Sequence, residues 1–148
     1  MTDDQRRHIE FRKATADDTE AILRFWSAAE ATPTKTDTPE HVGIVIGHPG
    51  AAFFIAVAGD EIVGSIIGTF DGWRGHVYRL AVHPRYRRHG IARDLVRHVE
   101  IAFRTWGAKR ILALVERDRS SALEFWKAAG YVADDSSCAP SPHAERRI

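Results

Sequence analysis

The stretch that decides the fold covers residues 78–98, YRLAVHPRYRRHGIARDLVRH, where a strand pattern runs through a basic turn into a helix pattern. The first turn of a helix leaves backbone N–H groups without partners, and the helix dipole adds positive potential there. Gly90 lets an anion approach the main chain, while Arg87, Arg88 and Arg93 supply positive charge and forked donors. This layout predicts a phosphate-binding site at the start of the helix.

The spacing of this turn excludes the two commonest nucleotide-binding loops. Residues 87–92, RRHGIA, contain neither a Gly-Lys-Ser/Thr ending nor a three-glycine fingerprint. They resemble the Arg/Gln-x-x-Gly-x-Gly/Ala signature of the GCN5-related N-acetyltransferases (GNAT). Residues 80–84, LAVHP, resemble the strand end before this signature, and residues 122–131 resemble the later Ala-x-x-hydrophobic-Tyr-x-x-x-Gly-Phe segment. Residues 68–93 look most similar to the small bacterial branch that includes ribosomal-protein N-terminal acetyltransferases.

The resemblance covers essentially the whole chain, so we expect a single domain over residues 1–148. It implies the GNAT fold, an α/β (α+β) arrangement with a mixed, mostly antiparallel sheet of six to seven strands and about four helices. The fourth and fifth strands splay apart and admit the pantetheine arm of the cofactor, acetyl-coenzyme A (acetyl-CoA). The cofactor-binding residues that it implies are Leu80, Ala81 and Val82 through their backbone, the loop residues Arg87, Arg88, His89, Gly90, Ile91, Ala92 and Arg93, and Arg119, Phe125 and Trp126 in the later segment.

The reaction that the resemblance implies is direct acetyl transfer to a primary amine, which requires a base because a free alkylammonium has a pKa of about 10.4. His76 lies four residues before Leu80, where the histone-acetylating branch has its glutamate. Strand alternation predicts that His76, Tyr78 and Leu80 share one face. Glu116, which closes the fifth strand, is the second candidate base. The ribosomal-protein branch has its glutamate two residues earlier, where this sequence has Leu114.

The main departure from the family pattern is Trp126, which stands where most members have the tyrosine that protonates the departing thiolate. An indole donates a hydrogen bond but not a proton. The duty therefore passes to Tyr131 or to Tyr78, or the chain binds an acyl-CoA as a sensor without turnover. Arg119 likewise replaces a frequent asparagine that contacts the pantetheine.

Two other tryptophans, Trp26 and Trp73, are candidate acceptor-binding residues. In the resembled fold the first helix and the turn before the fourth strand border the acceptor side. Indole rings there would favour an aromatic or amphiphilic amine. The acceptor itself, a small-molecule or a peptide amine, stays open.

Apolar periodicity and turn signals predict the remaining elements. Helices are expected over residues 17–30, after Thr38-Pro39, over 91–106 with Gly107 as its end, and over 122–129 behind a Ser121–Glu124 capping box. Strands are expected over residues 9–14, 52–58, 62–70, 76–82 and 110–115, with two short strands in the tail.

Composition limits the other possible functions. Of 148 residues, 44% are hydrophobic and the formal net charge is +1, which argues against a protein that coats nucleic acid. No uninterrupted apolar run approaches the roughly 20 residues of a membrane span. A nucleic-acid-directed module remains a lesser alternative, supported only by the arginine cluster. One cysteine excludes an intrachain disulfide, no metal-ligand spacing is present, and we expect a cytoplasmic monomer or homodimer.

Overall fold

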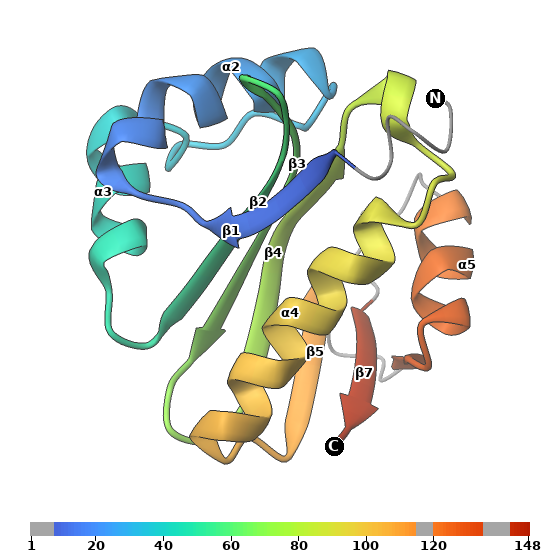
Figure 1. Cartoon of the computed structure of the whole chain (residues 1–148). Helices are drawn as coiled ribbons and strands as arrows, with labels where there is room; N and C mark the ends of the chain where they lie inside the picture. The colour runs from blue at the N-terminus through green and yellow to red at the C-terminus, as the bar shows by residue number, and fades with distance from the viewer. Residues whose placement is uncertain (1–7, 115–119, 135–142) are drawn as a thin grey trace.

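The structure is a computed structural model that describes residues 8–114, 120–134 and 143–148. Across these residues seven strands form one sheet in the order β1-β2-β3-β4-β5-β7-β6 (Figure 1). The strands are β1 (Ile9–Lys13), β2 (Ala51–Ala58), β3 (Glu61–Phe70), β4 (Gly75–Val82), β5 (Arg110–Leu114), β6 (Val132–Asp134) and β7 (His143–Arg147). The helices are η1 (Ala16–Asp18), α2 (Thr19–Ala28), α3 (Pro39–Gly47), η2 (Pro84–Tyr86), α4 (Ile91–Trp106) and α5 (Ser120–Ala128).

All neighbouring strands in this sheet are antiparallel except β4 and β5, which run parallel. A parallel pair requires a crossover connection, and α4 supplies it. The mixed sheet and the parallel pair at its centre confirm the fold class predicted from the sequence.

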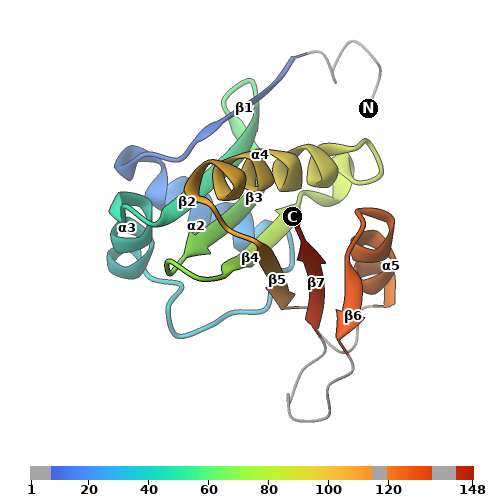
Figure 2. The ribbon, with the colours of Figure 1, turned by 90° about the horizontal axis from the view of Figure 1, so that it is seen from below.

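The helices cover the two faces of the sheet with separate hydrophobic clusters (Figures 1 and 2). Helices α2 and α3 pack on one face through a cluster that includes Ile22, Trp26 and Ile55. Helices α4 and α5 pack on the other face through a cluster that includes Leu95 and Trp126. In the described part of the chain, no helix is both long and apolar enough to cross a membrane.

Helix α4 approaches the sheet closely because glycines of β3 and β4 lie beneath it. A Cβ atom on Gly68 would lie 2.6 Å from Val99 Cγ1, and one on Gly75 would lie 2.8 Å from a ring carbon of Phe103. Both distances are too short for real side-chain contacts. The absence of side chains at these positions therefore sets the height of α4 above the sheet.

Local signals predicted most helix boundaries. Thr38 Oγ1 accepts a hydrogen bond from His41 N–H at 3.2 Å at the start of α3, and Gly107 ends α4 with φ at +84°. Two predictions are wrong. The predicted helix over residues 17–30 is divided into η1 and α2, because Asp18 accepts a hydrogen bond from Thr15 N–H and forms a separate turn. Helix α5 already includes Ser120, so Ser121 lies inside its first turn and is not its N-cap.

Candidate functional site

The parallel strands β4 and β5 pair only at one end and then separate. Residues 75–77 of β4 pair with residues 111–113 of β5, whereas β4 continues to Val82 and β5 ends at Leu114. A cleft of about 610 Å³ opens beyond the paired residues. Its walls are residues 77–82 of β4, the segment from η2 to the first turn of α4, the start of the α2–α3 loop (residues 29–38) and one side of α5.

One end of the cleft is the N-terminus of α4. Gly90 is the N-cap residue, with φ at +82°, and its carbonyl accepts the first helical hydrogen bond, from Asp94 N–H at 3.0 Å. The N–H groups of the three residues between them precede this bond and have no helical carbonyl to pair with. These residues, Ile91, Ala92 and Arg93, line the cleft. The end of the cleft therefore offers N–H donors and the positive end of a helix dipole to an anion.

Arginines surround this end of the cleft. Arg87 donates from Nε to the Val82 carbonyl at 3.2 Å and from Nη2 to the Ala29 carbonyl at 3.3 Å. Arg93 donates from Nη2 to the Ala128 carbonyl at 2.9 Å, at the C-terminal end of α5. These hydrogen bonds connect neighbouring walls of the cleft, and the positive charges of both side chains stay at its edge. The part of the cleft wall that the structure describes contains four arginines, Arg79, Arg87, Arg88 and Arg93, and no carboxylate, which suits an anionic ligand.

Strand β4 is irregular in the middle of the cleft. Tyr78 pairs with Ile67 of β3 and Ala81 pairs with Ser65, so Arg79 and Leu80 together face one residue of β3. This is a β-bulge, and Arg79 adopts φ at +54° within it. A non-glycine residue in the left-handed region costs about 1–3 kcal/mol. The surrounding structure must therefore compensate for the strain.

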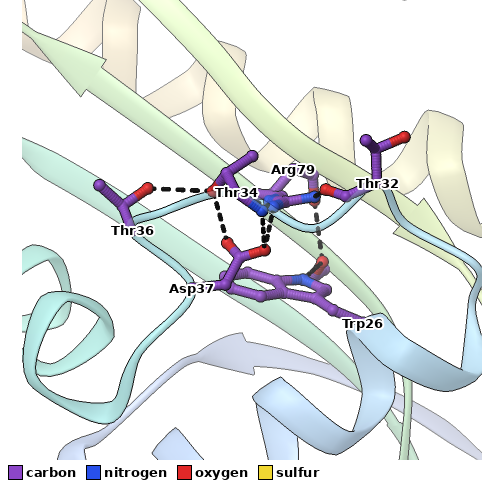
Figure 3. A network of polar contacts seen from close by, with 7 residues as sticks. Trp26, Thr32, Thr34, Thr36, Asp37 and Arg79 are labelled. Atoms are coloured by element: carbon purple, nitrogen blue, oxygen red, sulfur yellow. Dashed lines mark hydrogen bonds and ion pairs between the residues drawn. The ribbon is translucent and has the colours of Figure 1, made fainter.

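A buried hydrogen-bond chain supports the bulge (Figure 3). Ser65 Oγ donates to the Arg79 carbonyl at 2.8 Å, and Trp26 Nε1 donates to Ser65 Oγ at 2.9 Å. Ser65 has no exposed surface, and Trp26 is only 4% exposed. The indole of Trp26 thus supports the backbone that lines the cleft indirectly, through its hydrogen bond to Ser65.

The bulge corrects one prediction from the sequence. Val77 and Leu80 both pack in the cluster beneath α4, and Ala81 packs in the cluster beneath α2. His76 and Tyr78, which flank Val77, stack on each other with ring centroids 6.3 Å apart. Leu80 therefore does not share a face with His76 and Tyr78, because the extra residue at Arg79 shifts the alternation of every side chain after it.

The structure brings most of the predicted cofactor residues together along the cleft. The predicted residues that line it are Tyr78, Leu80, Ala81, Val82, Arg87, Arg88, Gly90, Ile91, Ala92, Arg93, Phe125 and Trp126. His89 is half-buried and does not line the cleft. Glu116 and Arg119 lie outside the described residues.

Phenols and tryptophans differ in their access to the cleft. Tyr78 lines the cleft and is 40% exposed, and His76 stacks on it without lining the cleft. Tyr131 is 2% exposed, and burial, together with the nearby Glu100, raises the pKa of its hydroxyl. Trp126 borders the cleft with a largely buried ring that packs against Tyr131 at 4.7 Å. Of the two phenols considered for proton transfer, only Tyr78 has access to a ligand in the cleft.

The two candidate acceptor-binding tryptophans lie apart from the cleft wall. Trp26 is buried beneath α2 in the hydrogen-bond chain described above. Trp73 is 72% exposed in the turn before β4, and the Arg74 guanidinium lies 4.1 Å from its ring centroid. Neither Trp26 nor Trp73 lines the cleft.

Sequence reasoning missed several residues of the cleft wall. Arg79 carried no signal, because the left-handed position of a bulge is usually recognised by a glycine. Ala29, Ala31 and Thr32 enter the wall because α2 ends beside β4, which depends on tertiary packing. Tyr86 also lines the cleft, and its place directly before the Arg-rich turn was a usable signal. The described residues contain no group of three or more His, Cys, Asp or Glu side chains that could hold a metal ion.

Comparisons with known proteins agree with this geometry. A family model described as the acetyltransferase (GNAT) family matches residues 17–131. Acetyltransferase SG1711 of Sodalis glossinidius is 30% identical over 86% of this chain and 90% of its own length. Acetyltransferase ECA0875 of Pectobacterium atrosepticum is 30% identical over 83% of this chain and 87% of its own.

Solved structures share the fold at lower identity. A PaiA N-acetyltransferase of Thermoplasma acidophilum, in complex with coenzyme A, superposes with a TM-score of 0.81 at 18% identity, over 95% of this chain and 99% of that one. The ribosomal-protein-S18-alanine N-acetyltransferase of Escherichia coli gives a TM-score of 0.75 at 14% identity, over 95% and 92% of the two chains. At this level of identity the likeness concerns the fold alone.

Proposed function

The chain belongs to the acetyltransferase (GNAT) family, whose members transfer an acetyl group from acetyl-CoA, and from this premise we propose that a primary amine is its acceptor and attacks the acyl carbon directly. The observation that carries the proposal is the opening between β4 and β5. In one cleft of about 610 Å³, this opening joins the N-terminus of α4, which suits an anion, to the irregular backbone of β4.

The residues of the cleft fit this cofactor. The N–H groups of Ile91, Ala92 and Arg93, with the charge of Arg88, suit the diphosphate. The apolar side chains of Leu80, Val82 and Phe125 suit the pantetheine arm. When bound, acetyl-CoA supplies the activated acyl group as a thioester. A backbone N–H group within residues 79–82 would donate to the acyl oxygen as it gains negative charge, a contribution that is worth about 2.7–4 kcal/mol per donor in related chemistry.

Two protons must move, and neighbouring side chains of β4 are suited to both. We assign the base to His76, because its ring stacks on Tyr78 and a neutral imidazole nitrogen can accept a proton. We assign the acid to Tyr78, because its phenol borders the cleft. Trp126 donates no proton at the family's usual position. Glu116 remains the alternative base, and the acceptor remains a small-molecule or peptide amine.

The test measures free thiol when the protein is incubated with acetyl-CoA and a pool of amines. We expect amine-dependent thiol release by the wild type. The Tyr78→Phe variant should lose about 10²- to 10⁴-fold in kcat and keep its affinity for coenzyme A, because only a proton donor is removed. The matched control is Tyr131→Phe, which removes a buried hydroxyl behind the cleft and should leave kcat unchanged.

The second candidate function is an acyl-CoA sensor, favoured by Trp126. A sensor would bind coenzyme A in calorimetry and release no thiol with any amine. Absence of both binding and release would reject the family-based proposal for this chain altogether. The cytoplasmic location and the state of monomer or homodimer stay predictions from the sequence.

A further inference from the structure

Arg79 combines a strained backbone with a side chain that is fully engaged. Its main chain adopts φ at +54° in the β-bulge at the centre of the cleft. Its guanidinium extends across the surface to the α2–α3 loop, where it meets three oxygen-bearing partners (Figure 3). A residue that keeps a strained conformation and whose side chain also makes several polar contacts is a candidate for a functional role.

The contacts of the guanidinium are specific and shielded. Nη1 donates to the Thr32 carbonyl at 2.9 Å, and Nη2 donates to Thr34 Oγ1 at 3.3 Å and forms an ion pair with Asp37. The side chains of Arg79 and Asp37 are only 16% and 18% exposed. The guanidinium also lies 4.9 Å from the ring centroid of Trp26. Water therefore competes weakly for this pair, in contrast to most surface ion pairs.

Asp37 is itself held in place by the loop. Its carboxylate accepts hydrogen bonds from Thr34 N–H at 2.9 Å and from Thr34 Oγ1 at 3.0 Å. Burial alone would raise the pKa of Asp37, but these hydrogen bonds and the Arg79 guanidinium lower it below its ordinary value. The carboxylate is thus charged and oriented toward Arg79 at neutral pH.

We propose that Arg79 and Asp37 are positioning residues for acyl transfer: the pair holds the β4 bulge in its left-handed conformation and thereby aims a backbone N–H group within residues 79–82 at the acyl oxygen. The inference rests on the proposed function of the cleft. The same pair fastens the α2–α3 loop, whose residues Ala31 and Thr32 line the cleft, to this backbone. The loop wall and the oxyanion-binding strand then move as one unit.

The physical reason is the register of β4. If the side-chain contacts of Arg79 are lost, the strain favours a regular strand without the extra residue. A slip by one residue would exchange the faces of Leu80, Ala81 and Val82. The N–H group that faces the ligand would then point to the opposite edge of the strand. A glycine at position 79 would behave differently, because it adopts a positive φ without strain.

The test compares Arg79→Ala with Arg79→Gly. Both variants remove the guanidinium, and only glycine accommodates the bulge. We expect Arg79→Ala to lose at least about tenfold in kcat with an unchanged KM for acetyl-CoA, and Arg79→Gly to recover at least about fivefold of that loss. In ¹H–¹⁵N spectra, the Leu80 and Ala81 peaks should stay near their wild-type positions in the glycine variant and move in the alanine variant. Equal activity and equal spectra of the two variants would overturn the proposal.

Asp37→Asn tests the other half of the pair and covers the case in which Arg79→Ala does not fold. Its matched control is Asp18→Asn, because Asp18 also pairs with an arginine, Arg12 at 2.8 Å, and also accepts from a threonine N–H three residues earlier. The Arg12–Asp18 pair joins β1 to η1, away from the cleft. We expect Asp37→Asn to lower kcat by about tenfold with unchanged coenzyme A affinity, and Asp18→Asn to leave kcat unchanged.

Equal effects of the two asparagine variants on kcat would show that the ion pair has only a structural role and would overturn the inference. Wild-type protein that binds no coenzyme A, or releases no thiol, would instead reject the proposed function, and the positioning role would fall with it. Wild-type turnover with unaffected Asp37 and Arg79 variants rejects this inference alone.

Discussion

Gly90 and Arg79 both have a positive φ and both line the cleft, but they meet the cost of this conformation in different ways. Gly90 has no Cβ, so the left-handed conformation at the start of α4 is free of strain. Arg79 has a side chain, and its conformation depends on Asp37, Ser65 and Trp26. At the scale of single residues, the left-handed conformation is therefore free of strain at Gly90 and depends on long-range contacts at Arg79.

The first prediction concerns Gly90. A Gly90→Ala substitution places a methyl group on a left-handed residue beside the N–H groups that face the ligand. We expect coenzyme A affinity to fall at least about tenfold, because the methyl group strains the N-cap and obstructs the approach of a phosphate. Titration calorimetry measures the dissociation constant directly.

The control for this variant is Gly59→Ala in the turn between β2 and β3. Gly59 also has a positive φ, at +63°, and its added Cβ would have no neighbour within 4 Å. It therefore reproduces the backbone strain without the phosphate site. If the two variants weaken coenzyme A binding equally, the diphosphate does not lie at the start of α4.

At the scale of elements, α4 packs closely on the sheet through one buried face. Leu95, Val99 and Phe103 follow one another at four-residue spacing along the buried face of α4, and none of them is exposed. Gly64 and Gly68 of β3 lie directly beneath them. At these contacts the helix contributes large side chains and the glycines contribute none, so α4 can lie close to the sheet.

The second prediction follows from this complementarity. Gly68→Ala would place a Cβ 2.6 Å from Val99 Cγ1 and 2.9 Å from Phe103 Cζ. We expect the free energy of unfolding to fall by about 1–3 kcal/mol, because α4 must move outward or the side chains must leave their preferred rotamers. Urea denaturation followed by tryptophan fluorescence gives this value.

Gly43→Ala is the matched control for the second prediction. Gly43 lies inside α3, and an added Cβ there would have no neighbour within 4 Å. The same substitution should raise the free energy of unfolding by about 0.5–1 kcal/mol, because alanine favours the helix. A Gly68→Ala protein as stable as the wild type would mean that α4 does not pack on the sheet at the described distance.

The elements themselves were largely predictable from the sequence, because their signals are local. The apolar spacing from Ile91 predicted α4 to the residue, and Thr38-Pro39 predicted the start of α3. The bulge in β4 was not predictable, because it depends on contacts between Arg79 and a loop more than forty residues away. The prediction that Leu80 shares a face with Tyr78 failed for this reason. The acceptor side depends on such contacts as well, so composition alone could not place Trp26 and Trp73.

At the scale of the whole molecule, the cleft separates two groups of elements. Strands β1 to β4 lie on one side of the junction between β4 and β5, and β5, β6, β7 and α5 lie on the other (Figure 2). The two sides are joined by the short pairing of β4 with β5 and by the hydrophobic cluster beneath α4. A ligand that contacts both β4 and α5 would add a third connection.

The third prediction is that coenzyme A stabilises the entire chain against heat. A ligand that binds only the folded state at about 100 times its dissociation constant adds about 2.7 kcal/mol to the free energy of unfolding. For a chain of this size, this corresponds to a rise in Tm of roughly 5–10 °C. Differential scanning calorimetry measures the shift, and Gly90→Ala at the same ligand concentration should show a smaller one. A wild-type Tm that is independent of coenzyme A would argue against binding in the cleft.

The fourth prediction concerns stability in acid and the Arg12–Asp18 pair. Hydrogen bonding from Arg12, supported by Thr15, lowers the pKa of Asp18 from 3.8 to about 2 despite its partial burial. A carboxyl group whose pKa is lower in the folded state stabilises the fold above the unfolded pKa, and this contribution is lost as the pH falls through the folded value. The Arg12 side chain is 36% exposed, so water screens the pair, and we expect a contribution of about 1 kcal/mol.

Asp18→Asn should therefore lower the free energy of unfolding by this amount from about pH 7 down to about pH 4, and the difference from wild type should vanish near pH 2. Urea titrations across this range measure the difference, with Asp17→Asn in the same turn as an exposed control that should match the wild type. A difference between wild type and Asp18→Asn that stays constant down to about pH 2 would mean that the carboxylate charge of Asp18 does not stabilise the fold.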